Sequence, residues 1–568
     1  MKASKKRGFT IIELVIVIAV IAILAAVLIP TFANIIQKAN VANDVALARN
    51  MNTILIADEA TNGRSTDMYD VLIALEQGGF KLENLNPRAD GNVFAWDKAN
   101  NQIVYLEKGS TKPIFQAKEI GNNKGDLYIT TRKAEVFADY PGYSYYFASD
   151  ISGNITLDEG SCLDTGEFAL NGNVSVVTKK DVEIHGTING TITVDSASGK
   201  ITNYSVVKNV VIKNTAATSY HERGHVAAME IQNSLTGKVV LENDAYVEKL
   251  TNNKTNGTVE NNGFVKEVAG TDTSVPATGS EYVLEIGTYD QLVNFRNKVN
   301  AGASYSGMTV KLTADIDISE RAWTPIGAAH RDKIEAQTNV FQGTFDGQDH
   351  KITGLTNTGF KISSVFKGSN STTPEGYSEY VFGLFGSVYN ATIKNIVMAN
   401  VNIDLACDEK EKVVGDSVGA IVGYAAGTNV TIDSCKVLSG SIVGYDAVAG
   451  IIGRTYSAKT TINKCENAAT VTAIRRAGGI LGFTSGGKGT RVTAITNCKN
   501  SGNVKQTGTP TTDPAGEGGI NYYMVAGLAI CQKGNSPEID ITGSTNTGTV
   551  TLTVSAGGKN KSDTVWYY

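Results

Sequence analysis

The chain has 568 residues, more than a single domain usually contains, and this length predicts three or four domains. Its formal net charge of -5 disfavours general nucleic-acid binding, which depends on a basic surface. Gly contributes 59 residues and Pro only 10, a composition that predicts many short strands joined by tight turns and argues against disorder.

An apolar segment dominates the N-terminus. From Phe9 to Ile29 only Thr10 and Glu13 are polar, and a helix of this length spans roughly 31 Å, the thickness of a bilayer's hydrocarbon core. The segment is longer than the apolar region of a cleaved secretory signal. The four basic residues within positions 2–7 predict a cytoplasmic N-terminus and an exported remainder.

Glu13 is the unusual residue of this segment, because an ionisable group in an apolar span costs about 3 kcal/mol unless it is paired. The stretch resembles the N-terminus of type IV prepilins and pseudopilins. The resemblance implies that prepilin peptidase cuts between Gly8 and Phe9, that the amine of Phe9 is methylated, and that Glu13 neutralises the amine of a neighbouring subunit in a filament. It also makes Pro30 the residue that kinks the helix. The alternative is a plain membrane anchor with an accidental glutamate.

Residues 9–62 are predicted to form one helix roughly 80 Å long, because apolar residues recur at helical spacing and no Gly or Pro follows Pro30 before Gly63. Its first half would lie in the membrane or filament core, and its second half would support a globular head. Residues 63–148 are assigned to that head. They combine a helix over 67–77 with a hairpin formed by 93–96 and 102–106, an α+β order that loosely resembles the pilin head.

Residues 149–270 contain short apolar strands separated by turns, which fits either a sandwich or a solenoid of parallel strands. We favour the solenoid because Asn recurs at the turns, where it tolerates left-handed backbone angles.

The segment from His221 to His225 has the spacing of a zinc-hydrolase motif, with Glu222 as the general base. Gly224 weakens a helix, and the motif follows a strand-like run, so a polar loop between rungs is the favoured interpretation. Three acidic residues are candidate third ligands: Glu230, Glu242 and Glu248.

Residues 271–280 are predicted to be a linker, and residues 281–378 to hold an N-terminal cap and the first rungs of a β-helix. Thr288 and Gln291 form a capping-box pattern before an amphipathic helix, which would cover an open solenoid end. Four carboxylates nearby are equally well interpreted as turn and strand-end residues, so we expect no glycosidase pair: Asp315, Asp317, Asp346 and Asp349.

Residues 379–568 carry repeats that open with a glycine-bounded apolar hexad. The hexads are Val381–Gly386, Val418–Gly423, Val448–Gly453, Ala477–Gly482 and the degenerate Val525–Ile530. Such units stack and align identical positions in ladders. Cys435, Cys465 and Cys498 occupy one position in three successive units, which predicts a stack of buried thiols, with a disulfide as the alternative. Cys162, Cys407 and Cys531 have no evident partners in the sequence.

The repeats resemble the GLUG motifs of bacterial surface proteins, which implies a right-handed parallel β-helix and a role in surface display or adhesion. The whole chain is therefore interpreted as a minor or tip subunit of a type IV pilus-like filament, not an enzyme, and with no cofactor. Its expected partners are prepilin peptidase, other pilin subunits, the membrane before assembly, and a glycan or matrix ligand. Exposed aromatic residues, among them Tyr377, Tyr380 and Trp566, are candidates for sugar stacking or for covering the last rung. The alternatives are a pseudopilin of a type II secretion or DNA-uptake machine and a membrane-anchored zinc or carbohydrate-active hydrolase.

Overall fold

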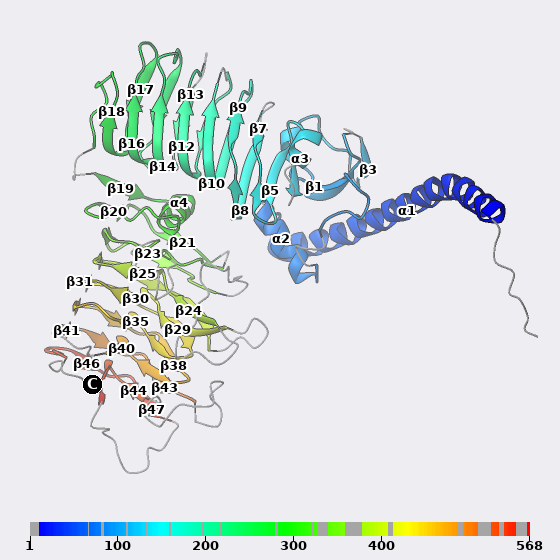
Figure 1. Cartoon of the computed structure of the whole chain (residues 1–568). Helices are drawn as coiled ribbons and strands as arrows, with labels where there is room; N and C mark the ends of the chain where they lie inside the picture. The colour runs from blue at the N-terminus through cyan, green and yellow to red at the C-terminus, as the bar shows by residue number, and fades with distance from the viewer. Residues whose placement is uncertain are drawn as a thin grey trace, which may run out of the picture. The chain divides into compact units, whose positions relative to one another are not determined.

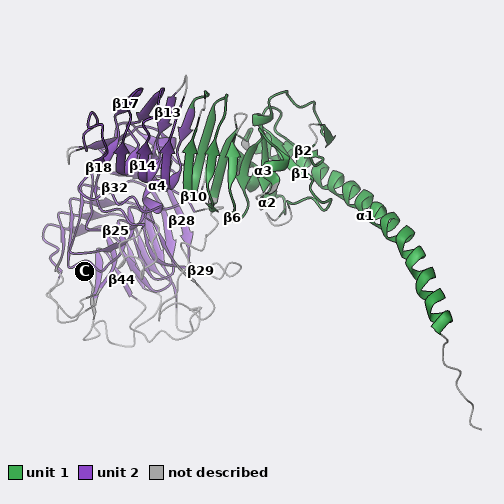
Figure 2. Cartoon of the chain, turned by 45° about the horizontal axis from the view of Figure 1, so that its top comes forward, with its two compact units in different colours: residues 1–200 green, residues 201–568 purple. Residues whose placement is uncertain are grey.

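A computed structural model describes most of the chain and divides it into two compact units, Met1–Lys200 and Ile201–Tyr568 (Figure 2). The described residues are 11–65, 67–80, 85–109, 112–131, 135–157, 161–195, 198–215, 219–278, 282–319, 322–327, 339–357, 378–406, 413–485, 492–508, 524–532, 539–552 and 565–567. The division at residue 200 falls inside the predicted 149–270 segment, and the predicted boundaries of the individual segments stay predictions.

A single helix, α1 (Ile11–Asn62), opens the first unit and confirms the predicted long helix (Figure 1). Pro30 lies inside it, where its ring cannot donate the usual backbone hydrogen bond. Figure 1 shows α1 curving along its length. One turn is reinforced because the Thr31 hydroxyl donates to the Val27 carbonyl at 2.8 Å.

A small α+β head follows α1 and packs on its C-terminal half. Its elements are α2 (Met68–Gln77), β1 (Val93–Asp97), β2 (Gln102–Leu106), β3 (Pro113–Phe115), a 3-10 turn (Lys124–Asp126), β4 (Leu127–Thr131) and α3 (Glu135–Asp139). Strands β1 and β2 form the predicted antiparallel hairpin. Met51 and Leu55 of α1 share a core with Val71 of α2 and with the fully buried Trp96.

Parallel strands continue the sheet of the first unit. They are β5 (Ser144–Phe147), β6 (Ile151–Ser152), β7 (Ile155–Leu157), β8 (Cys162–Asn171), β9 (Val174–Val176) and β10 (Val182–Val194). Strand β4 pairs with β5, β5 with β8, and β8 with β10, all in parallel. The hairpin sheet of the head is therefore extended strand by strand into a solenoid.

The second unit opens with the same architecture. Its first strands are β11 (Ile201–Asn203), β12 (Val206–Ile212), β13 (Ser219–Glu222), β14 (His225–Ile231), β15 (Lys238–Leu241), β16 (Tyr246–Asn252), β17 (Thr258–Asn261) and β18 (Phe264–Ala269). Odd-numbered strands stack in one parallel ladder and even-numbered strands in another. This pairing confirms a solenoid over a sandwich.

Helix α4 (Tyr289–Asn300) follows β19 (Val283–Ile286) and buries Leu292, Phe295 and Val299 in the core of the next solenoid. Its N-cap is the predicted one, because the Thr288 hydroxyl accepts from the Gln291 amide at 3.3 Å. The Gln291 side chain accepts from Gly287 at 2.7 Å, one residue earlier than a standard capping box.

The remaining strands form a parallel β-helix built from five sheets. The first sheet continues from β19 with β20 (Thr309–Leu312), β22 (Thr344–Asp346), β26 (Thr392–Lys394), β31 (Asn429–Asp433), β36 (Lys459–Asn463) and β41 (Val492–Thr496). The second holds β21 (Ile316–Asp317), β23 (Lys351–Thr353), β27 (Val397–Ala399), β32 (Lys436–Val437), β37 (Glu466–Asn467), β42 (Lys499–Asn500) and β46 (Thr545–Asn546).

The other three sheets come from the repeats. The third holds β24 (Ser378–Phe382), β29 (Val413–Gly419), β34 (Ala447–Ala449), β39 (Arg476–Gly478) and β44 (Met524–Ala526). The fourth holds β25 (Phe385–Tyr389), β30 (Val422–Ala426), β35 (Ile452–Thr455), β40 (Leu481–Ser485), β45 (Ala529–Gln532) and β48 (Val565–Tyr567). The fifth holds β28 (Val401–Leu405), β33 (Gly440–Gly444), β38 (Thr470–Ala473), β43 (Val504–Gln506) and β47 (Val550–Leu552).

The predicted ladders are present. Val418 pairs with Val448, and Val448 with Ala477, so the hexads stack in register. Cys435, Cys465 and Cys498 are buried free thiols, which confirms the predicted stack, and the Cys465 amide donates to the Cys498 sulfur at 3.4 Å. Cys407 lies outside the described residues.

The packing settles one expectation about aromatic residues. Tyr380 is only 1% exposed, so the prediction that it is an exposed aromatic residue is wrong, because it lies on a strand packed into the core. Trp566 lies on β48, the last strand of the fourth sheet, which pairs antiparallel with β45, and its predicted covering role stays a prediction. Tyr377 and Tyr568 lie outside the described residues.

The last glycine has a steric role in the four complete hexads. A Cβ atom on Gly453 would lie 2.4 Å from the Val418 nitrogen, and one on Gly482 would lie 2.6 Å from the Val448 nitrogen. The fourth sheet therefore contacts the backbone of the third sheet directly, which only glycine permits.

We expect Gly453→Ala to destabilise the β-helix by about 1–3 kcal/mol, because the added methyl group must push two backbones apart. Thermal unfolding of the full chain in detergent, followed by circular dichroism, measures the change. Gly121→Ala is the matched control, since a Cβ there meets nothing within 4 Å. Equal melting of the two variants would contradict the steric role.

Candidate functional site

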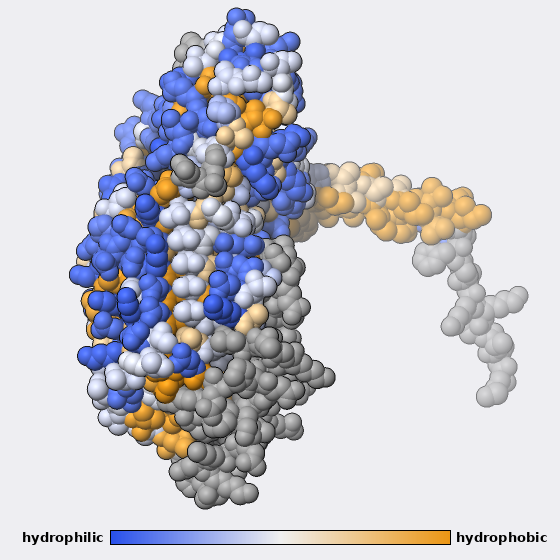
Figure 3. All heavy atoms as spheres, turned by 90° about the vertical axis from the view of Figure 1, so that its left-hand side faces the viewer, coloured by the Kyte–Doolittle hydropathy of each residue, from blue (hydrophilic) through white to orange (hydrophobic). Residues whose placement is uncertain are grey.

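The N-terminal half of α1 is an apolar surface that its own chain leaves uncovered. Its side chains are exposed from Ile11, at 81%, through Ile36, at 58%. Figure 3 shows this helix as a continuous hydrophobic surface. Its most apolar window has a mean hydropathy of 3.3 and is long enough to cross a membrane. Soluble proteins rarely expose so much contiguous apolar surface, and such surfaces mark sites that contact a membrane or other proteins.

Glu13 lies in the first turn of α1 and is exposed within the single chain. A carboxylate at a helix N-terminus interacts favourably with the helix dipole, and here it is also surrounded by apolar side chains. Gly8 and Phe9, the predicted processing residues, lie outside the described residues. Pro30 lies farther along the same exposed half of the helix.

Buried polar residues fix the other half of α1 to the head. The Asp44 carboxylate accepts from the backbone amides of Arg88 and Ala89 and from the Tyr105 hydroxyl, at 2.8, 2.9 and 2.9 Å. The Asn52 side chain donates to the carbonyl of Ile103 and accepts from its amide, both at 2.8 Å. These bonds satisfy buried polar groups of α1, of the bend at 88–89 and of β2, and they fix the helix to the head at defined backbone positions.

The motif from His221 to His225 does not lie on a helix. His221 and Glu222 end β13, and His225 begins β14, so the two histidines are separated by a strand-to-strand corner. His221 Nδ1 lies 2.6 Å from Glu242, and His225 Nε2 lies 3.2 Å from Glu248. The two histidines thus have different carboxylate partners, and the third candidate, Glu230, contacts neither in any hydrogen bond of the described chain. The arrangement fits a polar corner between rungs.

Glu222 is fully buried and belongs to a different network. It accepts hydrogen bonds from the Tyr220 hydroxyl at 2.6 Å, from Asn203 at 3.0 Å and from the Gly224 amide at 2.6 Å. Burial nevertheless raises the pKa of the Glu222 carboxyl to about 7. Lys298 of α4 is also buried and donates to the Asp244 carbonyl, and burial lowers its pKa. Periodicity in the sequence contained no sign that either side chain is buried, because both look like surface charges.

A buried ion cluster joins the third and fourth sheets. Arg454 donates to Asp446 at 2.8 Å and to Asp416 at 3.3 Å, and Arg476 donates to Asp446 at 2.5 Å. Burial alone would raise the pKa of Asp446, but Arg476 and Arg454 hold it well below its usual range. Every member is paired, so the cluster is a structural connection between the sheets.

The four carboxylates considered for sugar hydrolysis are turn and strand-end residues, as predicted. Asp315 accepts from the Lys351 amide, Asp317 from the Ser319 amide and Asp346 from the Gln348 amide, at 2.9, 2.9 and 3.1 Å. Asp349 has a left-handed backbone angle, which is typical of a tight turn.

A column of threonines runs along the outer face of the first sheet, and sequence reasoning missed it. Its members are Thr309, Thr344, Thr392, Thr431 and Thr461, which pair in register from strand to strand. All are half-buried. Figure 3 shows a pale column of near-neutral residues between hydrophilic surfaces on this side of the molecule. Its signal in the sequence is a Thr two residues before a Lys, Asp or Asn at or near the end of each strand.

The neighbouring column alternates in charge. Lys311, Asp346, Lys394 and Asp433 stand one above another, and Lys394 pairs with Asp346 at 3.1 Å. The two lysines and two aspartates of this column together carry no net charge. The threonine column beside them therefore presents a row of hydroxyl groups, repeated at the strand spacing of about 4.8 Å, next to a surface without net charge.

Comparison with known proteins connects the N-terminal helix to a family. Residues 3–29 match the family model described as the prokaryotic N-terminal methylation motif. Over 112 residues the chain is 33% identical to the type IV major fimbrial protein FimA of Dichelobacter nodosus, covering 69% of that protein and 19% of this chain. Over 98 residues it is 44% identical to a fimbrial protein of Moraxella nonliquefaciens, covering 63% of that protein and 16% of this chain.

A longer but weaker similarity covers more of the chain. Over 378 residues, 63% of its length, the chain is 25% identical to halomucin of Haloquadratum walsbyi, of which this segment spans only 4%. No solved structure matches the chain.

The buried Glu222 predicts a pH dependence of stability. Its pKa is higher in the folded chain than the 4.5 of a free side chain, so the folded state binds the proton more tightly. Its stabilising contribution is therefore complete below about pH 4.5 and is lost as the pH rises to 7, by roughly 3 kcal/mol. Chemical denaturation between pH 4 and 8 measures this slope.

Glu222→Gln should flatten that slope, whereas Glu260→Gln, at an exposed position on β17, should leave it unchanged. An unchanged slope in Glu222→Gln would show that another group carries the effect.

Proposed function

Because this chain belongs to the family of type IV fimbrial proteins, we propose that it is a minor or tip subunit of a type IV pilus-like filament and presents its β-helix as an adhesive domain. The observation that carries the proposal is the contrast between an uncovered apolar helix and a large, polar, self-contained repeat domain. The proposed role is structural and not enzymatic.

Assembly through α1 follows from its exposed half. In lipid, the apolar residues beyond Ile11 are covered by acyl chains, and in a filament they would be covered by the same helix of other subunits. Glu13 at the head of this helix would pair with the amine of a neighbouring Phe9 after removal of residues 1–8. Prepilin peptidase, the neighbouring pilins and, before assembly, the cytoplasmic membrane are therefore the proposed partners.

The size of the exported part supports a minor or tip position. The alignment with the major fimbrial protein covers 112 residues, and most of this chain lies beyond it. Filament subunits packed around a helical core leave little room for a domain of about 290 residues on every copy. A subunit present in few copies, or at the end of the filament, avoids this steric limit.

The threonine column is the proposed adhesive face. Hydroxyl groups repeated at about 4.8 Å, with few uncompensated charges, suit a ligand that is itself a repeating chain of hydroxyl groups. A polysaccharide has this chemistry, and hydrogen bonds spread over several rungs would add to one another. The GLUG-like character of the repeats is consistent with surface display and stays a prediction.

The assembly role predicts a defined N-terminus and a dependence on Glu13. Mass spectrometry of the chain from surface filaments should find residues 1–8 absent and Phe9 methylated. Glu13→Ala should lower the amount of this chain in sheared filaments at least about tenfold, because an unpaired amine remains in the apolar core. Asp404→Ala, at an exposed position on β28, is the control and should assemble normally.

Immunogold labelling of residues 281–568 distinguishes a minor or tip subunit from a subunit that is present along the whole fibre. Sparse or terminal labelling is expected, and uniform labelling along the fibre would overturn the minor-subunit proposal. Normal assembly of Glu13→Ala would overturn the role of the glutamate.

The adhesive face is tested by removing hydroxyl groups without changing shape. Thr392→Val together with Thr431→Val should weaken binding to a polysaccharide array roughly 10–30-fold, since each lost hydrogen bond contributes about 1 kcal/mol. Thr472→Val, on the fifth sheet, is the matched control. Binding that is unaffected by the double variant, or that occurs only to matrix proteins, would contradict a polysaccharide face on the first sheet.

A further inference from the structure

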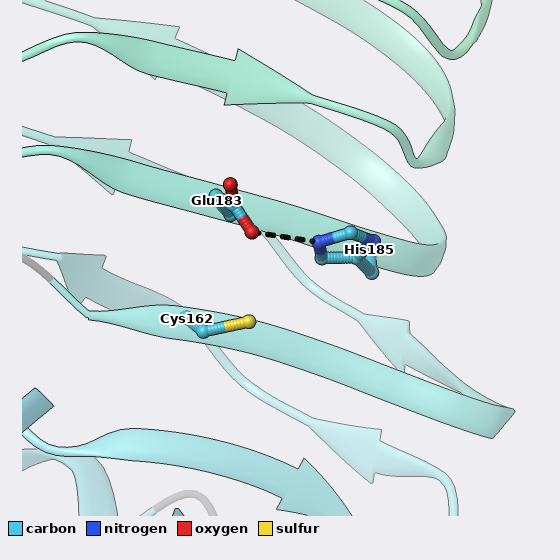
Figure 4. Close-up of side chains that lie close together, drawn as sticks. All are labelled: Cys162, Glu183 and His185. Carbon is cyan, nitrogen blue, oxygen red and sulfur yellow. Dashed lines mark hydrogen bonds and ion pairs between the residues drawn. The ribbon is translucent and has the colours of Figure 1, made fainter. Parts of the chain in front are cut away.

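Two neighbouring strands of the first unit bring together three side chains that ligate metals. Strands β8 and β10 are parallel partners, with Glu183 directly opposite Cys162 and His185 directly opposite Asp164. Side chains two residues apart on a strand point to the same face, so all four lie on one face of the sheet. Figure 4 shows Glu183 and His185 on one strand and the Cys162 sulfur on the next.

The donor atoms of three of these residues are close enough to share one ion. The Cys162 sulfur, a Glu183 carboxylate oxygen and a His185 ring nitrogen all lie within 4.8 Å of one another. Glu183 Oε2 and His185 Nε2 are 3.4 Å apart. Ligands of a tetrahedral zinc ion are separated by roughly 3.3–3.8 Å, so side-chain shifts of about 1 Å would complete the geometry. Within the described residues this is the one group of three such donors.

We propose that Cys162, Glu183 and His185 bind a single Zn²⁺ ion. A thiolate, an imidazole and a carboxylate form a mixed sulfur, nitrogen and oxygen set, which suits zinc and other borderline-soft transition metals. The same set is unsuited to Ca²⁺ or Mg²⁺, which require six or more oxygen ligands or a shell of water.

The surroundings of the site restrict how its ligands move. The Cys162 amide donates to the Ser144 hydroxyl at 3.0 Å, which holds the cysteine backbone against β5. Asp164 accepts from the Gly166 amide at 2.8 Å and lies directly opposite His185 on β8, beside the three donors but outside their group.

A metal here would join consecutive rungs where the solenoid begins. Cys162 is on β8, and the other two ligands are on β10, so the ion would cross-link two adjacent strands of the ladder. The motif from His221 to His225 contrasts with this arrangement, because each of its histidines faces a separate carboxylate. The site does not depend on the proposed filament function.

The test uses the full chain in detergent, with Zn²⁺ as the probe. After dialysis against zinc and then against buffer, elemental analysis should find about one zinc per chain, and thermal unfolding of the first unit should shift upward. Cys162→Ser and His185→Gln should each weaken zinc binding about 100-fold in calorimetric titration. Glu183 is exposed, so Glu183→Gln is the variant expected to disturb folding least. It should weaken zinc binding by about tenfold or more.

His221→Gln is the matched control, since it removes a histidine that is also paired with a glutamate on a solenoid strand. It should bind zinc like the unaltered chain. Co²⁺ provides a second readout, because a sulfur-to-cobalt charge-transfer band should appear in the near ultraviolet and vanish in Cys162→Ser. Absence of stoichiometric zinc in the unaltered chain would overturn the proposal. It would also be overturned if both Cys162→Ser and Glu183→Gln retained zinc, or if zinc were lost only in His221→Gln.

Discussion

The stacking of parallel strands is the constraint on which most of this structure depends. Each rung lies about 4.8 Å from the next, so a side chain in one rung meets the residue at the same position of its neighbours. A position that tolerates only a small residue therefore tends to be small in successive rungs. The glycines that end the four complete hexads follow this rule, whereas Ile530 ends the degenerate fifth hexad. Stacking also aligns the thiols of the three cysteines and the side-chain amides of three asparagines. Asn467 donates to Asn500 at 2.8 Å, and Asn500 donates to Asn546 at 2.7 Å.

Stacking also accounts for which features were predictable from the sequence. A ladder repeats its residue types at a fixed place in each unit, so the hexads and the three cysteines could be aligned without any structure. The long helix was equally predictable, because apolar residues continue at helical spacing over many turns without a Gly or Pro to end them after Pro30. The threonine column left the same kind of periodic signal, but in outward-facing positions, where a polar residue is expected in any strand and is not diagnostic.

The sequence did not reveal the contacts that occur at a single place in the structure and are not repeated from rung to rung. Lys298 looks like an ordinary surface lysine on an amphipathic helix, yet it is buried because α4 lies between the end of one solenoid and the start of the next. Cys162 has no partner nearby in the sequence, since Glu183 and His185 are 21 and 23 residues away and meet it only through strand register. The cluster around Asp446 likewise depends on two sheets approaching closely, which a local pattern does not encode.

The N-terminal helix and the β-helix are stabilised in different ways. Helix α1 is fixed to the head by Asp44 and Asn52, whose bonds to single backbone groups tolerate no change of register. The β-helix is stabilised between neighbouring rungs, so adding or losing a rung alters only the contacts at that point. Variation in the number and surface of the rungs therefore leaves the helix and its head untouched. A chain built this way can vary its repeats while keeping its N-terminal helix constant, a property that would suit the proposed adhesive role.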